Sequence, residues 1–202
     1  MFQDINKQSG AIAKVLLALG IVVLIGLGVA YLVVNSAKPK PKPTEIPTTP
    51  QAVYESTIND IRFVFLESTD LGKTLFAKNS LRPEWNKDIH TTERYIKVIV
   101  GAQNVAKENT LDRIWNLGDI IDSEGRHYVP LKRDKIGDWL PLVELCGDIL
   151  KPSFEPTPCT KLYEVANVAK GLKVTVMHYK TTDNPKDALT EIIDIKLMAN
   201  SN

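Results

Sequence analysis

The chain has 202 residues, enough for one ordinary domain and short for two. Lys and Arg total 25 and Asp and Glu total 24, so the formal charge is only +1. Nucleic-acid binders need a basic face to neutralise phosphates, and this balance therefore argues against a nucleic-acid partner. A hydrophobic content of 44% is typical of a folded protein, but the apolar residues are concentrated near the N-terminus.

The segment Val15–Val34 contains no charged residue. At a rise of 1.5 Å per residue a helix of this length spans roughly 30 Å, the thickness of the hydrocarbon core of a bilayer. The pattern predicts a single transmembrane helix over residues 15–34, through which the chain contacts the lipid bilayer. Residues 1–14 are then a short cytoplasmic tail.

A cleaved signal peptide is the alternative to an anchor. Its apolar stretch is about 7–15 residues long and ends at small residues, whereas this run is longer and contains only a weak match at Gly28–Ala30. The sequence therefore favours an uncleaved signal-anchor. The flanking charges alone do not settle the orientation, because lysines lie on both sides of the run: Lys7 and Lys14 before it, and Lys38, Lys40 and Lys42 after it. The two cysteines described below weakly favour a cytoplasmic N-terminus.

Residues 35–51 form a linker rich in Pro and Lys. Five prolines fall between Lys38 and Pro50, and alternating prolines favour an extended polyproline conformation. At about 3.1 Å per residue this stretch can hold a domain roughly 40 Å from the bilayer. A spacer is favoured over a ligand for a proline-binding domain.

The remaining residues, 52–202, predict one extracytoplasmic all-β domain. Short apolar runs alternate with turn residues, and no long amphipathic helix interrupts them; this pattern is typical of a β-sandwich. The expected strands are Ile61–Phe65, Tyr95–Val100, Trp115–Ile121, Arg126–Val129, Lys161–Val165, Leu172–Met177 and Glu191–Leu197.

Three connections in this domain can be predicted. The turn Asp122–Gly125 joins two apolar runs, and Gly125 can adopt a positive φ to form the bulge of a hairpin. The segment Leu71–Thr92 has no clear period and is expected to be a long loop that carries Trp85. Asp138–Val143 indicates a helical turn.

The order of these segments resembles a known family. The residues that carry the resemblance are a strand that ends in Asn104, an apolar strand that reaches Asp122–Tyr128, a stretch around Pro152, and a returning strand Thr160–Val165. Together, over residues 56–197, they resemble the immunoglobulin-like domain of unknown function found in bacterial and archaeal membrane-anchored proteins and lipoproteins, sometimes mislabelled as a telomeric repeat-binding factor. The resemblance implies an extracytoplasmic immunoglobulin-like sandwich of about seven strands and supplies no catalytic residues.

Cys146 and Cys159 are the two cysteines of the chain. Neither has a second Cys or His at the short spacing of a zinc site. Buried free thiols are one reading, but outside the cytoplasm a disulfide is favoured. Closing this loop contributes about 3 kcal/mol in the chain-entropy model. Prolines within the loop, at positions 152, 156 and 158, are expected to exclude regular structure until Thr160.

Residues that could carry other chemistry are scattered. His90, His127 and His178 lie in separate segments, and the acids Asp119, Asp122 and Glu124 lack the spacing of a calcium loop because residue 120 is isoleucine. Turn chemistry explains these acids better than a metal. No nucleophile, phosphate-loop or metalloprotease motif is present. We therefore assign no catalytic, cofactor-binding or metal-binding residue.

The three tryptophans differ in their surroundings. Trp115 and Trp139 are core candidates, whereas Trp85 lies in an irregular polar stretch and is the residue expected to be exposed for interaction. The sequence thus predicts a single-pass membrane protein whose extracytoplasmic domain is a non-catalytic binding module for an envelope protein, a peptide or a glycan. A structural or accessory subunit of a membrane complex is the alternative, because Gly20, Gly26 and Gly28 could pack against partner helices. An enzyme ranks third.

Overall fold

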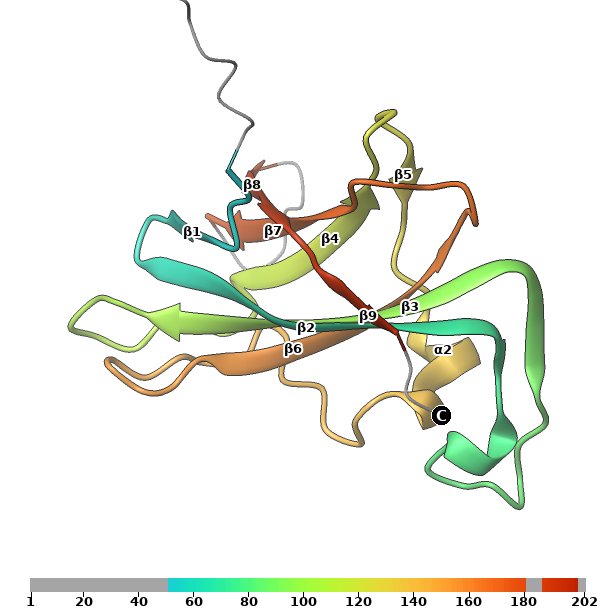
Figure 1. Ribbon diagram of the computed structural model, residues 1–202. Coiled ribbons are helices and arrows are strands. Elements are labelled where there is room, and N and C mark those ends of the chain that lie inside the picture. Colours follow the sequence, from blue (N-terminus) through green and yellow to red (C-terminus); the bar gives the residue numbers. More distant parts are fainter. Residues whose placement is uncertain (1–50, 181–186, 200–202) are drawn as a thin grey trace, which may run out of the picture. The chain divides into compact units, whose positions relative to one another are not determined.

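The computed structural model of the protein describes residues 51–180 and 187–199 (Figure 1). The predicted tail (1–14), membrane helix (15–34) and linker up to residue 50 lie outside the described residues. Within the described ranges, no helix has the length and apolar character needed to cross a membrane. The described residues belong to one compact unit, Gln51–Asn202.

Nine strands and three short helices make up the described part of the domain. The strands are β1 (Glu55–Ile58), β2 (Ile61–Leu75), β3 (Ile89–Asn104), β4 (Trp115–Ile121), β5 (His127–Tyr128), β6 (Thr157–Val165), β7 (Lys173–Tyr179), β8 (Ala188–Asp194) and β9 (Leu197–Ala199). The helices are η1 (Ala77–Asn79), α2 (Arg133–Ile136) and η2 (Gly137–Trp139).

The strands form two sheets that face each other as a sandwich (Figure 1). One sheet has the order β1-β2-β3-β6, and β9 joins β2 on the edge that β1 also occupies. The other sheet has the order β5-β4-β7-β8. Neighbouring strands are antiparallel, except that β9 runs parallel to β2.

Alternating apolar residues build the core between the sheets. On β3 the residues Ile96, Val98 and Val100 are fully buried, as the two-residue period of a strand with one face on the core requires. Trp115 of β4 packs edge-on against Phe63 of β2, with ring centroids 6.4 Å apart. The apolar area removed from water by these side chains is the main force that holds the two sheets together.

One buried hydrogen bond also joins the sheets. The hydroxyl of Tyr163, on β6, donates to the carbonyl oxygen of Gly118, on β4, at 2.8 Å. Burial raises the pKa of Tyr163, so its hydroxyl remains a neutral donor. This bond satisfies the polar end of a side chain that is otherwise packed in the core.

The β-sandwich prediction is confirmed, and so are several of its parts. The strand Trp115–Ile121 has the predicted bounds. In the hairpin turn, Gly125 has a φ of 77°, and its amide donates to the carbonyl of Asp122 at 3.0 Å. This is the type of turn and bulge that the Asp–Gly spacing predicts.

The predicted loop Leu71–Thr92 is wrong at both ends. β2 continues to Leu75 and β3 already begins at Ile89, so the connection is only residues 76–88. The strand pairing shifts register between Asp70 and Thr74. Such bulges break the two-residue alternation and hide a strand from a periodicity argument.

Other boundaries also differ from the sequence-based expectation. The predicted strand Glu191–Leu197 is two strands, β8 and β9, which belong to different sheets. The helical turn lies at Arg133–Trp139, before the predicted Asp138–Val143. The domain has more strands than the expected seven. The four-residue β1 is mostly polar, and the three-residue β9 is too short to show an alternating pattern.

Candidate functional site

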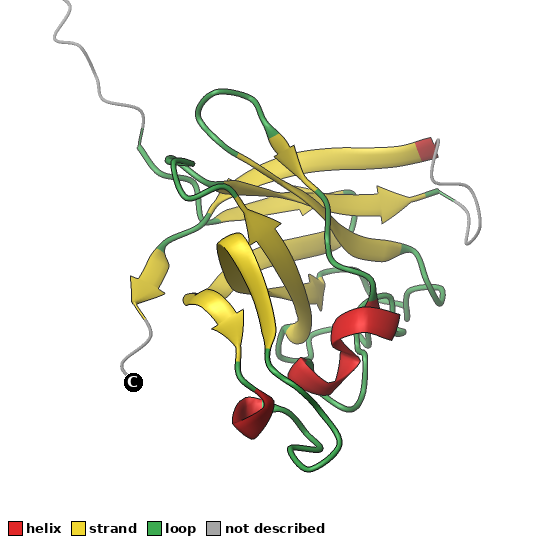
Figure 2. Cartoon of the chain, turned by 90° about the vertical axis from the view of Figure 1, so that its right-hand side faces the viewer, coloured by secondary structure: helices red, strands yellow, loops and turns green. Residues whose placement is uncertain are grey.

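The connection between β2 and β3, residues 76–88, lies at one end of the domain together with the α2–η2 segment (Figure 2). The coloured ribbon begins at Gln51 at the other end (Figure 1). We name residues 76–88 the β2–β3 loop. Sandwich folds often carry their binding residues on the loops at the ends of the sheets. The two packed sheets hold the ends of each loop in place, so the loop side chains are free to contact a partner.

Asp138 of η2 organises the β2–β3 loop. One of its carboxylate oxygens accepts hydrogen bonds from Nε and Nη2 of Arg82, at 3.1 and 2.7 Å. The other accepts a bond from Nδ2 of Asn86 at 2.8 Å, and the carbonyl of Asp138 accepts one from the amide of Leu81 at 2.7 Å. The bonds from Arg82 and then from Asn86 lower the pKa of Asp138. The carboxylate thus braces the middle of the loop in its charged form.

Bonds within the loop and at its start complete this bracing. Nδ2 of Asn86 also lies 3.0 Å from Oγ of Ser80, which joins the two arms of the loop. At its start, the carbonyl of Phe76 accepts a bond from the indole nitrogen of Trp139 at 3.0 Å. The amide of Ala77 donates to Asp88 at 2.7 Å. The loop is therefore built by specific contacts along its whole length.

Trp85 is displayed on this braced loop. Its side chain is 80% exposed, as predicted, whereas Trp115 in the core is 1% exposed. The third tryptophan, Trp139, is partly buried and packs against a small apolar cluster around Leu75. A large exposed indole is costly to hydrate and is enriched at binding surfaces. Its interaction role stays a prediction.

A hollow of about 320 Å³ adjoins the start of the β2–β3 loop. Its wall combines aromatic and aliphatic side chains with neutral hydrogen-bonding groups and one ammonium group. The lining residues are Leu71, Thr74, Leu75, Phe76, Asn79, Lys97 and Trp139. Ligand pockets typically measure about 300–1,000 Å³ and combine an apolar wall with a few polar groups, so this hollow fits the lower end of that range. Sequence reasoning missed it, because its residues come from four separate segments.

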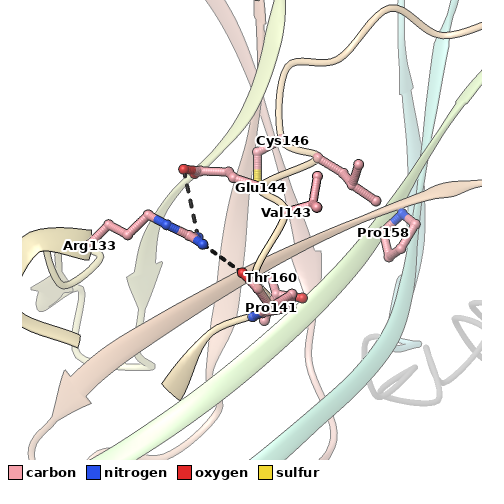
Figure 3. Close-up of a pocket in the computed structure, with 8 residues that line it drawn as sticks. Arg133, Pro141, Val143, Glu144, Cys146, Pro158 and Thr160 are labelled. Carbon is pink, nitrogen blue, oxygen red and sulfur yellow. Dashed lines mark hydrogen bonds and ion pairs between the residues drawn. The ribbon is translucent and has the colours of Figure 1, made fainter. Parts of the chain in front are cut away.

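Cys146 and Cys159 form a disulfide, with their Cα atoms 4.7 Å apart. The bond fixes the segment after η2 to β6 and closes one side of a small pocket of about 70 Å³ (Figure 3). In this pocket the guanidinium of Arg133 lies 2.6 Å from the carbonyl of Pro141 and 3.9 Å from the carboxylate of Glu144. These contacts of Arg133 hold the segment after η2 against the short helix α2.

The expectation that prolines keep this region out of the sheet is wrong for Pro158. Strand β6 begins at Thr157, so Pro158 and Cys159 lie within it, and Pro158 pairs with Gly101 of β3. β6 is an edge strand of its sheet. On an edge strand, a proline whose nitrogen faces away from the neighbouring strand removes no hydrogen bond from the sheet. The edge position thus tolerates a proline that a central strand would exclude.

The acidic turn has a structural explanation. Burial by itself raises the pKa of Asp122, but hydrogen bonds from the amide and guanidinium of Arg126, the hydroxyl of Tyr128 and the amide of Glu124 outweigh it and lower the pKa to about 2. Asp119 instead pairs with His127, at 3.2 Å. Turn chemistry therefore accounts for these carboxylates.

The other two histidines lie apart from one another. Nδ1 of His90 lies 2.9 Å from the hydroxyl oxygen of Thr74, and Nδ1 of His178 lies 3.4 Å from the side-chain Nδ2 of Asn59. In residues 51–180 and 187–199, no group of three or more His, Cys, Asp or Glu side chains is placed to hold a metal ion.

Comparisons with known proteins yield one structural neighbour. No protein-family model matches the chain, and no curated protein matches its sequence. A solved crystal structure, that of a conserved hypothetical protein from Bacillus anthracis, is similar with 14% sequence identity and a TM-score of 0.44. The similarity covers 72% of this chain and 94% of that protein.

Proposed function

We propose that this protein is a membrane-anchored binding module whose extracytoplasmic, immunoglobulin-like sandwich presents the β2–β3 loop to a partner. It acts without catalysis and belongs to the immunoglobulin-like domain family that its sequence resembles. The single observation that carries the proposal is the display of Trp85, 80% exposed, on a loop held by side-chain bonds to Asp138.

The bracing matters because a flexible loop loses conformational entropy when it binds. Fixing a rotamer-rich side chain costs about 0.5–1.5 kcal/mol, and a loop that is already ordered avoids much of this cost. Tryptophan is also among the residues that contribute most to binding energy at interfaces. A braced loop that exposes an indole therefore has the properties of a preorganised binding element.

Two features support the extracytoplasmic location. The uncharged run Val15–Val34 is long enough to anchor the chain, and the Cys146–Cys159 disulfide is of a kind that persists in oxidising compartments. The loop also lies at the end of the domain away from Gln51, where the chain enters (Figure 1).

Site-specific photo-cross-linking in intact cells tests the proposal. Leu81, an exposed residue of the β2–β3 loop, is replaced by p-benzoylphenylalanine in the full chain so that Trp85 stays in place, and Leu111, an exposed apolar residue in a loop of the opposite end, is replaced in a matched control. We expect a cross-linked adduct from position 81 and none from position 111. Equal adducts from both positions, or none, would refute a role for the β2–β3 loop.

Protease added to intact cells tests the topology separately. The domain is expected to be removed while a cytoplasmic control protein survives, and a protected domain would overturn the orientation. Purification of the full chain from mild detergent tests the accessory-subunit alternative, which the glycines at positions 20, 26 and 28 favour. Stable co-purifying membrane subunits support that alternative.

A further inference from the structure

An exposed apolar segment of three residues follows η2. Pro141 is exposed, and the side chains of Leu142 and Val143 are 80% and 63% exposed. Leu140, directly before them, is only 6% exposed, so the chain passes from the core to the surface at this point. Single exposed apolar residues are common, but a run of three on a surface is unusual and points to a contact. We name these three residues the 141–143 segment.

Contacts on both sides hold the backbone of the 141–143 segment in place (Figure 3). Nη2 of Arg133 donates to the carbonyl oxygens of its first two residues, at 2.6 and 3.0 Å. Just after the segment, Glu144 accepts a bond from Nζ of Lys161 at 2.7 Å, and Cys146 is fixed by its disulfide. Because this backbone is already ordered, burying its side chains against a partner costs less conformational entropy than ordering a flexible loop would.

The hollow beside the β2–β3 loop is complementary to this segment. Its volume of about 320 Å³ is roughly twice that of a protein cavity of about 150 Å³ that binds benzene, so it has room for two aliphatic side chains. Three of its lining residues are polar and four are apolar. The apolar ones are Leu71, Leu75, Phe76 and Trp139.

The 141–143 segment and the hollow lie in one patch of the surface. Trp139 lines the hollow, and Leu142 follows it by three residues in the chain. Three residues span at most about 11 Å, so the Cα atoms of Trp139 and Leu142 are no further apart than this. A patch that contains both a protruding apolar side chain and a hollow with apolar walls can be self-complementary, which is what the two-fold interface of a homodimer requires.

The charged groups that hold the segment or line the hollow are paired within the chain. Glu144 lies 3.9 Å from the guanidinium of Arg133 and accepts the bond from Lys161. Lys97, which lines the hollow, lies 3.5 Å from the carboxylate of Glu67. Like charges that face each other across an interface oppose association, and this pairing reduces that opposition when two identical patches meet.

We propose that this patch joins two copies of the chain. The 141–143 segment of one protomer enters the hollow of its partner, and the partner's segment enters the hollow of the first protomer. The two contacts are equivalent, so the assembly closes as a dimer. This inference goes beyond the proposed function and does not depend on the role of Trp85.

Photo-cross-linking of the full chain, purified in mild detergent, tests the contact. Val143 is replaced by p-benzoylphenylalanine so that Leu142 stays in place, and Leu111, which is 64% exposed, is replaced in a matched control. We expect a covalent dimer from position 143, cross-linked to residues 71–79 or to Trp139 of the second copy, and none from position 111. No dimer from position 143, or a dimer cross-linked elsewhere, would overturn the inference.

Sedimentation equilibrium of the full chain in the same detergent measures the Kd of the dimer. Leu142→Ser changes a side chain that is 80% exposed, so the fold is expected to survive. The variant should raise the Kd at least tenfold, because each dimer loses two buried leucine side chains. Leu111→Ser should leave the Kd unchanged. An unchanged Kd for Leu142→Ser would show that another part of the chain holds the copies together and would overturn the inference.

Mixing two variants tests the reciprocal arrangement. Asn79→Arg places a long charged side chain at the wall of the hollow and should by itself raise the Kd at least tenfold. Leu142→Ser keeps an intact hollow, and Asn79→Arg keeps an intact 141–143 segment. An equimolar mixture retains one of the two native contacts and should therefore associate several-fold more tightly than either variant alone. A mixture that associates no more tightly than the variants alone would overturn the segment-in-hollow contact.

Discussion

Removing the Cys146–Cys159 disulfide is expected to lower the free energy of unfolding by about 3 kcal/mol and to leave the β-sheet structure intact. The two residues are 13 positions apart. In the chain-entropy model a loop of this size loses roughly 10 cal/mol/K when it is closed in the unfolded state, which corresponds to about 3 kcal/mol at 25 °C. For a domain of roughly 150 residues this corresponds to a decrease in Tm of about 6–12 °C.

Calorimetry on the full chain measures the effect, with two variants that separate its causes. Cys146→Ala breaks the bond but keeps the sulfur atom of Cys159, which is fully buried in the core. The double replacement Cys146→Ala with Cys159→Ala also removes that atom, so the difference between the variants measures its packing. Far-ultraviolet circular dichroism should show the same β-signal in all three proteins.

Two outcomes would contradict this reasoning. Intact mass after alkylation of the native protein without reductant should show no added groups, and two added groups per chain would show free thiols. If Cys146→Ala lowers the Tm by less than about 2 °C, the disulfide does not restrict the unfolded chain as much as the loop length predicts.

Three further predictions concern the sandwich itself. Asp122→Asn should make the Tm depend less on pH between pH 4 and pH 2. In the folded protein the pKa of Asp122 is lowered from 3.8 to about 2, so its carboxylate stabilises the fold fully above pH 3.8 and loses this effect as the pH falls toward 2. Parallel curves of Tm against pH for the variant and the wild type, from pH 7 to pH 2, would contradict this prediction. Tyr163→Phe leaves the carbonyl of Gly118 without its donor and should cost about 1–2 kcal/mol in denaturant unfolding; an unchanged midpoint would argue against the bond between the sheets. Gly101→Ala places a Cβ atom 2.6 Å from Cβ of Pro156 and should cost about 1–3 kcal/mol, whereas a variant as stable as the wild type would show that this proline moves freely.

The sequence alone predicted those features of the fold that depend on residues close together in the chain. Two-residue alternation predicts the strand Trp115–Ile121, and an Asp–Gly spacing predicts the turn that ends at Gly125, because both depend on residues close in the chain. The exposure of Trp85 is predictable for the same reason, since no apolar neighbours in the sequence are available to cover it. The membrane anchor expected over Val15–Val34 lies outside the described residues and stays a prediction.

Only the tertiary structure decided which strands share a sheet and where the hollow beside the β2–β3 loop forms. The bulged end of β2 and the short β9 are strands because neighbouring strands supply their hydrogen-bond partners. The residues of these segments alone do not predict that pairing. Pro158 is tolerated because β6 is an edge, a property of the sheet rather than of the segment. The bracing of the β2–β3 loop by Asp138, 52 residues from Asn86, requires two loops to meet, and the burial of the core brings them together.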